Sequence, residues 1–103
     1  MKNLISIYAT FPDKKEAKKI IKALLESKLI ACANIFEAES FYTWKGKMEN
    51  ENEIVAFLKT KEENWEKVKE KIELLHSYEV PCILKLQIDG NLEYKNWILE
   101  SVN

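Results

Sequence analysis

The chain has 103 residues, of which 16 are lysine, none is arginine and 17 are acidic. This length allows one domain to bury its own core without a disulfide or zinc, and the balanced charge gives no basic field that would attract nucleic acid. No apolar run reaches the roughly 20 residues of a membrane-spanning helix, and the first residues lack the pattern of a signal peptide. We therefore expect a cytoplasmic protein without a nucleic-acid or membrane partner.

The first part of the chain predicts a strand, a helix and a long strand. Residues 4–10 form the strand, with Ile5, Ile7 and Ala9 on one face. Asp13 and Glu16 have the spacing of a capping box, with a carboxylate in place of the usual hydroxyl. The apolar stripe of the helix that follows consists of Ala17, Ile20, Ile21, Leu24 and Leu25. Residues 30–44 then predict a long strand and residues 45–47 a turn.

A second long strand is predicted over residues 48–60. Its tip at residues 49–53 is polar, and we expect the tip to be solvated. Thr60 and Glu63 predict another capping box, so that the strand leads directly into a helix. The apolar stripe of this helix consists of Trp65, Val68, Ile72 and Leu75, and His76 falls on the same face.

The last part of the chain predicts a fourth strand over residues 82–88 and a turn at Asp89 and Gly90. Asn91 is a candidate N-cap for a short final helix. The order β-α-β-β-α-β with a C-terminal helix is the ferredoxin-like arrangement. We therefore expect one α+β domain over residues 1–103, with a four-stranded antiparallel sheet, two helices on one face and a long hairpin.

The long hairpin and the second sheet face predict self-association. The strand over residues 48–60 is apolar on both faces at residues 54–58, so the face away from the helices cannot be left to water. A projecting hairpin also has bare edges that can pair with another chain. We expect an obligate homo-oligomer; the alternative is a monomer whose hairpin curls over its own sheet.

The connection at residues 76–81 holds the only histidine of the chain, together with Tyr78 and Glu79. Connections held by rigid flanking elements often carry binding groups. The alternative is that His76 and Tyr78 only end a helix and fill a gap in the core.

Candidate metal ligands are Cys32, His76 and Cys82, because copper-like ions bind imidazole and thiolate groups. They have no paired spacing, so one chain cannot supply a closed site, although neighbouring subunits of an oligomer could complete one. The alternative is that both cysteines are reduced, buried apolar residues, as is usual in cytoplasmic proteins.

Several motifs in order resemble the CutA divalent-cation tolerance family over nearly the whole chain. The matching segments are Thr10-Phe11-Pro12-Asp13, Leu29-Ile30-Ala31-Cys32-Ala33-Asn34-Ile35, Tyr42-Thr43-Trp44-Lys45-Gly46-Lys47, Lys59-Thr60 and His76-Ser77-Tyr78-Glu79-Val80-Pro81. The resemblance implies a homotrimer of ferredoxin-like subunits, similar in build to the P-II signalling proteins. It also implies a role in tolerance of copper or another divalent cation, with no organic cofactor and no catalysis. Ser77 and Cys82 depart from the family pattern, in which a proline and an acidic or small residue are usual.

The same resemblance suggests a ligand pocket between subunits for a small anionic or zwitterionic molecule. The positions that match the family are Trp44, Glu53, Lys59, His76, Tyr78, Glu79, Tyr94 and Trp97. The alternative for the aromatic residues is packing at an interface. Two other functions stay open, a P-II-like small-molecule sensor and a trimeric scaffold. An acylphosphatase is excluded because it needs an arginine, and RNA recognition because the sheet lacks flanking basic residues.

Overall fold

The computed structural model describes residues 3–103, which form one four-stranded sheet, three α-helices and a short 3-10 helix. The strands are β1 (Leu4–Phe11), β2 (Cys32–Trp44), β3 (Lys47–Lys61) and β4 (Ile83–Ile88). The helices are α1 (Lys14–Glu26), α2 (Trp65–Leu75) and α3 (Leu92–Ser101), with the 3-10 helix at Glu62–Asn64. The predicted order of elements is therefore confirmed.

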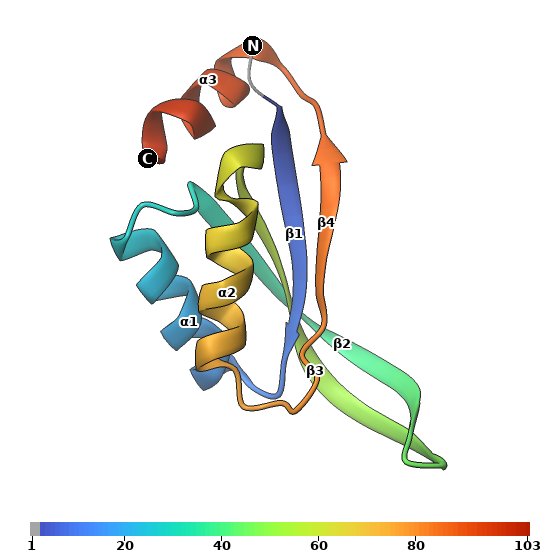
Figure 1. The fold of residues 1–103 in the computed structure, drawn as a ribbon. Coiled ribbons are helices and arrows are strands. Elements are labelled where there is room, and N and C mark those ends of the chain that lie inside the picture. Colours follow the sequence, from blue (N-terminus) through green and yellow to red (C-terminus); the bar gives the residue numbers. More distant parts are fainter. Residues whose placement is uncertain (1–2) are drawn as a thin grey trace.

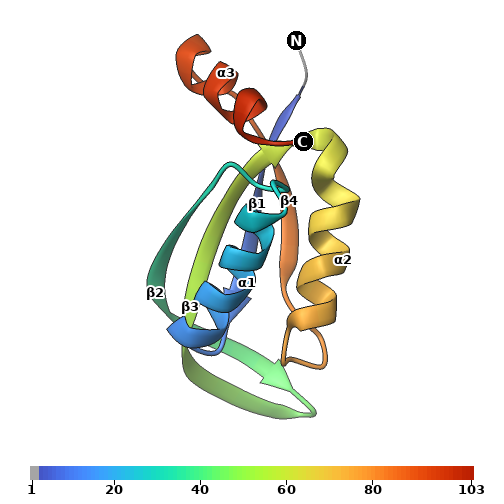
Figure 2. The same ribbon diagram turned by 90° about the vertical axis from the view of Figure 1, so that its left-hand side faces the viewer.

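The sheet has the strand order β2-β3-β1-β4, and each neighbouring pair is antiparallel. Helices α1 and α2 cover one face, and α3 lies near the end of the sheet where β4 finishes (Figures 1 and 2). The hairpin of β2 and β3 projects beyond the opposite end. Within residues 3–103 no helix is long and apolar enough to cross a membrane.

The core lies between the sheet and the two helices. Ile5, Ile7 and Ala9 of β1 are fully buried, as their alternation predicted, and they share one cluster with Val68 and Ile72 of α2 and with four residues of the predicted α1 stripe, Ala17, Ile20, Ile21 and Leu24. The fifth stripe residue, Leu25, is 40% exposed and lies outside this cluster. Asp13 caps α1, since its Oδ1 accepts the Glu16 N–H at 2.8 Å. Burial of this alternating set fixes the register of β1, because a shift of one residue would expose it.

The hairpin turn is tighter than predicted. Lys45 and Gly46 have φ values of 50° and 80°, and Lys47 already pairs with Trp44, so the loop has two residues rather than three. Two successive positive φ values are typical of the type I′ turn, whose twist matches that of the flanking strands. Gly46 satisfies this geometry at no steric cost.

The start of α2 differs from the prediction. The helix begins at Trp65 after the 3-10 helix, and Asn64 precedes it without a side-chain capping bond. Thr60 lies in β3, where its hydroxyl donates to the Leu29 carbonyl at 2.7 Å and accepts from Asn64 Nδ2 at 3.1 Å. The predicted Thr60–Glu63 capping box is therefore wrong, because Thr60 ties β3 to the segment before β2.

Two other predictions about ends need correction. The strand predicted from residue 30 begins at Cys32, and Ile30 is buried in the segment that precedes it. Asn91 does precede α3 in extended conformation, but its side chain makes no capping hydrogen bond.

The face of the sheet away from α1 and α2 carries a row of large apolar side chains. Tyr8 and Phe57 are directly paired, with ring centroids 5.5 Å apart, and Phe36 stacks on Phe57 at 5.8 Å. Leu84 and Leu86 of β4 lie on the same face and are about half exposed. We call this surface the open sheet face.

Candidate functional site

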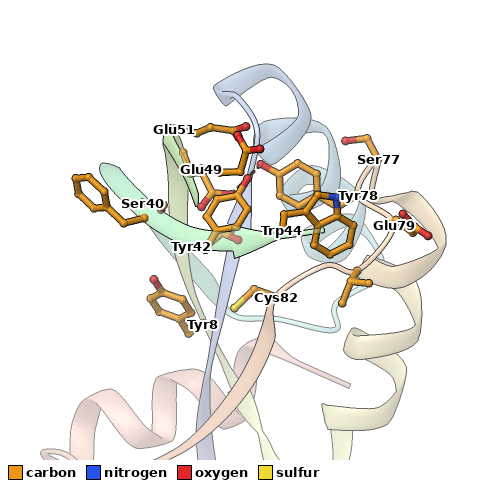
Figure 3. Close-up of a pocket in the computed structure, with 14 residues that line it drawn as sticks. Tyr8, Ser40, Tyr42, Trp44, Glu49, Glu51, Ser77, Tyr78, Glu79 and Cys82 are labelled. Atoms are coloured by element: carbon orange, nitrogen blue, oxygen red, sulfur yellow. Dashed lines mark hydrogen bonds between the residues drawn. The ribbon is translucent and has the colours of Figure 1, made fainter. Parts of the chain in front are cut away.

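A cavity of about 660 Å³ lies where the hairpin meets the open sheet face and the connection at residues 76–82. Figure 3 shows Tyr42, Trp44 and Glu49 of the hairpin and Tyr78 of the connection gathered around the same space. Tyr8 and Thr10 of β1 also line it. The hairpin and the connection thus form the walls of the cavity, and the surface of the sheet forms its floor.

The charged residues that line the cavity are all glutamates, namely Glu49, Glu51, Glu53 and Glu79. The first three alternate along β3, so their side chains share one strand face. Tyr42, Trp44 and Tyr78 form the aromatic walls of the cavity, and the four glutamates make it negatively charged. We call it the acidic cavity.

Glu53 is the most enclosed of these carboxylates. It is only 7% exposed, and its Oε2 accepts a hydrogen bond from the Tyr78 hydroxyl at 2.8 Å. The prediction that residues 49–53 are solvated is therefore wrong at Glu53, because the connection covers this part of β3. Partial burial and then the bond to Glu53 raise the pKa of Tyr78 well above its ordinary value, so its phenol stays a donor.

Tyr42 makes a similar contact nearer the hairpin tip. Desolvation raises its pKa, and a hydrogen bond to Glu51 adds to the effect. The sequence prediction did not include Tyr42, Glu49 or Glu51. The alternation of glutamates at residues 49, 51 and 53 was the available signal, and it pointed to a single acidic strand face.

His76 lies behind the acidic cavity. Its side chain is fully buried, its ring stacks on Phe11 at 5.1 Å, and its Nε2 lies 2.7 Å from the Thr10 carbonyl oxygen. Its Nδ1 accepts the Tyr78 N–H at 3.0 Å. Nε2–H must then be the donor to Thr10, which leaves neither nitrogen with a lone pair for a metal. His76 thus holds Tyr78 in place.

Glu16 completes the support of this connection. Its carboxylate accepts the Ser77 N–H at 3.0 Å, so it reaches across to the connection. The capping box predicted at Asp13 and Glu16 is thereby formed in part, by the Asp13 bond alone, while the Glu16 side chain anchors the end of α2 to the start of α1.

The remaining predicted pocket residues lie near the other end of the sheet. Lys59 Nζ donates to the Tyr94 hydroxyl at 3.4 Å, and the Tyr94 ring stacks on Trp97 with centroids 5.5 Å apart. Cys32 Sγ is 3.3 Å from the same hydroxyl. The eight predicted residues are therefore not one pocket in the chain. Trp44, Glu53, Tyr78 and Glu79 line the acidic cavity, whereas Lys59, Tyr94 and Trp97 form what we call the lysine cluster, with Cys32.

The three predicted metal ligands are not brought together either. Cys82 lines the acidic cavity, Cys32 belongs to the lysine cluster, and His76 is buried against Phe11 at the end of β1. Burial and then the charge of Glu53 raise the pKa of Cys82, which disfavours the thiolate that a metal needs. Among residues 3–103 there is no group of three or more His, Cys, Asp or Glu side chains that could hold a metal ion. A copper site closed within one chain does not fit.

Comparison with known proteins gives one consistent relationship. Residues 5–101 match the family described as CutA1 divalent ion tolerance protein. The divalent-cation tolerance protein CutA of Pyrococcus horikoshii is 47% identical over 98 residues, which cover 94% of this chain and 96% of that protein. A crystal structure of CutA1 from Pyrococcus horikoshii superposes with a TM-score of 0.93 at 45% identity, covering 96% of this chain and 98% of that one.

A structure from Archaeoglobus fulgidus, described as a periplasmic divalent cation tolerance protein CutA, gives a TM-score of 0.93 at 42% identity and covers 100% of both chains. These names refer to tolerance of divalent cations, and none of them names an enzyme. Sequence and fold agree along nearly the whole chain, and the chain therefore belongs to the CutA1 divalent ion tolerance protein family.

Proposed function

We propose that this chain is a non-catalytic binding protein in divalent-cation tolerance, and that the acidic cavity is where it meets the cation. The observation that carries this proposal is that every charged residue lining the cavity is a glutamate. Carboxylate oxygens are ligands for divalent cations, and among first-row ions Cu(II) binds a given oxygen or nitrogen site most tightly. Copper is therefore the first cation to test, and the cytoplasm stays our proposed compartment.

The proposal assigns the residues different tasks. Glu49 and Glu51 lie toward the open end of the cavity and would contact the ion, with further ligands from a neighbouring subunit, because residues 3–103 of one chain supply no closed site. Glu53 is held by Tyr78, which in turn is fixed through its backbone N–H by His76. The protein would bind the cation without changing it, because the cavity presents no nucleophile paired with a base.

We also propose that the working form is a homotrimer. The open sheet face exposes Phe36, Leu84 and Leu86, and β2 and β4 are edge strands whose outer backbone groups can pair with another chain. A monomer would leave this apolar surface in water. Coordination by Cys32 or Cys82 across a subunit boundary remains a prediction of this assembly, whereas His76 could coordinate a metal only if it gave up its bond to Thr10 or to Tyr78.

The test is a calorimetric titration of the purified protein with Cu(II). We expect saturable binding, with a whole number of ions for each subunit, and the double substitution Glu49→Gln with Glu51→Gln should weaken it by about ten-fold, a change of about 1.4 kcal/mol. The matched control is Glu70→Gln with Glu73→Gln, which removes the same charge from exposed positions of α2. Weak binding without stoichiometry, or equal loss in both variants, would contradict the assignment.

A small-molecule sensor is the second candidate, and the aromatic walls formed by Tyr42, Trp44 and Tyr78 favour it. A sensor predicts that an organic ligand raises the unfolding temperature when no metal is added, since a ligand that binds only the folded state stabilises it. A scaffold function predicts neither metal nor ligand binding. The same titration and a thermal-shift series therefore separate the three candidates.

A further inference from the structure

Lys59 has an unusual environment for a lysine in this chain. Its Nζ donates to Asn34 Oδ1 at 3.1 Å and to the Tyr94 hydroxyl at 3.4 Å, and it lies 5.4 Å from the centre of the Tyr94 ring. Across the described part of the chain, no carboxylate lies within 4.0 Å of this ammonium group. Lys59 is thus held in a fixed position by neutral groups and keeps an uncompensated positive charge.

Hydrogen-bond donors without a protein partner lie at the Lys59 ammonium group. A lysine ammonium has three hydrogens, and the two bonds to Asn34 and Tyr94 leave one for a further acceptor. Asn34 uses only its oxygen in that contact, so its amide N–H groups stay available for an acceptor. The donors therefore outnumber the acceptors at this place on the sheet.

Ser6 provides an independent observation. It is the direct cross-strand partner of Lys59, so both side chains rise from the open sheet face. Ser6 is only 4% exposed, and its Oγ has no hydrogen-bond partner within residues 3–103. A buried hydroxyl without a protein partner loses its bonds to bulk water, and an ordered water, an ion or a bound polar group normally replaces them.

We propose that Lys59, Asn34, Ser6 and the Tyr94 hydroxyl bind a small oxyanion, namely a carboxylate or phosphate group. An ammonium held without a counter-ion favours an anion, and hydrogen bonds to a charged acceptor are stronger than those between neutral groups. The Tyr94 ring at this site stacks on Trp97, with centroids 5.5 Å apart. No residue of this site lines the acidic cavity, so the site does not depend on the proposed cation function.

Tyr94 is suited to this role because its hydroxyl keeps its proton. The hydrogen bond with Cys32 raises the pKa of Tyr94 most, and desolvation adds to the increase. Either atom can be the donor in the Cys32–Tyr94 contact. A phenol that donates to the sulfur when the site is empty can turn its hydrogen to a bound anion, and the thiol can then donate to the phenol oxygen.

The test is a titration of the full chain, followed by amide chemical shifts, with sodium phosphate and with sodium acetate at constant ionic strength. We expect shifts that saturate near Asn34, Lys59 and Tyr94 and that sodium chloride does not produce. Saturation by phosphate alone identifies a phosphate ligand, and saturation by acetate identifies a carboxylate. Shifts that grow linearly with both salts would overturn the proposal.

The variants locate the site. Lys59→Met should weaken binding by about ten-fold or more, and Ser6→Ala should weaken it less. Asn34→Asp preserves the shape of the side chain but places a carboxylate against Lys59, so it should also weaken binding even if Lys59→Met fails to fold. Lys47→Met, at the far end of the same strand, is the matched control and should bind like the unaltered chain. Unchanged affinity in Asn34→Asp would overturn the site.

The Glu49→Gln and Glu51→Gln double variant separates the two proposals. It should lose Cu(II) binding and keep oxyanion binding, because its substitutions lie in the acidic cavity. Loss of both by this variant would show that the two regions are not independent and would contradict the separate oxyanion site.

Discussion

Tyr78 joins the connection at residues 76–82 to the sheet through one hydrogen bond, from its hydroxyl to Glu53. The residue is held from both sides, since His76 fixes its backbone and Glu53 fixes its phenol. A phenol that donates to a carboxylate resists ionisation, because the phenolate would face a like charge without a proton between them. The free energy of unfolding should therefore fall as the pH rises into the alkaline range.

We predict that Tyr78→Phe flattens this dependence. The pKa of Tyr78 is raised in the folded chain, so its contribution is fully present below the ordinary tyrosine value of about 10 and is lost as the pH rises above it. Between about pH 9 and 11, the unaltered chain should lose more stability in denaturant unfolding than the variant. Lysine deprotonation affects both chains alike, so parallel curves would contradict the prediction.

The hairpin of β2 and β3 depends on its two-residue turn. Gly46 has a φ of +80°, but an added Cβ would meet no atom within 4 Å. A substitution there is therefore costly only through the backbone conformation and not through a clash. Substitutions at Gly46 therefore measure the cost of the backbone conformation alone.

We predict that Gly46→Ala lowers the free energy of unfolding by about 1 kcal/mol and that Gly46→Asn lowers it less, because asparagine tolerates positive φ. Gly90→Ala is the control: its added Cβ also meets nothing within 4 Å, and its backbone is not in the left-handed region. Urea unfolding of the three variants measures the effect. Equal losses at residues 46 and 90 would show that the turn conformation is not the cause.

At the scale of elements, periodicity predicted most of the fold. The alternation in residues 4–10 and the stripe of α1 reflect burial on one side, which is a local property of the sequence. The start of α2 could not be predicted in this way, because Thr60 bonds to Leu29, which lies about thirty residues away in the chain. A capping box and a cross-link between strands use the same side-chain oxygen, and the sequence does not tell them apart.

The candidate site was predicted only in part, for a similar reason. The motifs identified the individual residues but not how they group in space. Glu53 and Lys59 lie six residues apart on β3, so Glu53 belongs to the acidic cavity and Lys59 to the lysine cluster. The burial of Glu53 comes from the connection folding over the strand, and a strand pattern contains no information on that contact. The acidic strand face at residues 49–53 was visible in the sequence, whereas its enclosure was not.

For the whole molecule, the open sheet face is the feature that most needs a partner. Phe36 is 47% exposed and stacks on Phe57, while Leu74 on α2 is 81% exposed on the helical side. Replacing Phe36 or Leu74 with glutamate adds one negative charge at an exposed apolar position. Only the glutamate at position 36 would lie in the proposed interface.

We predict that light scattering of the unaltered chain gives about three times the subunit mass of 12.1 kDa. Phe36→Glu should shift the population toward smaller species on dilution, because a buried unpaired charge at an interface is strongly unfavourable. Leu74→Glu should leave the mass unchanged. A monomer in the unaltered chain, or equal effects of both substitutions, would refute the trimer.

The strand order β2-β3-β1-β4 has a consequence for symmetry. The two edges of the sheet are different strands, so a contact in which β2 of one copy meets β4 of the next is head-to-tail rather than self-complementary. Each copy then contributes β2 to one subunit boundary and β4 to the other. A pair of copies built this way still has two unused edges, while a closed ring has none, and a rotation that fails to close gives an open fibre. The geometry of one subunit boundary therefore decides between a finite ring and unlimited growth.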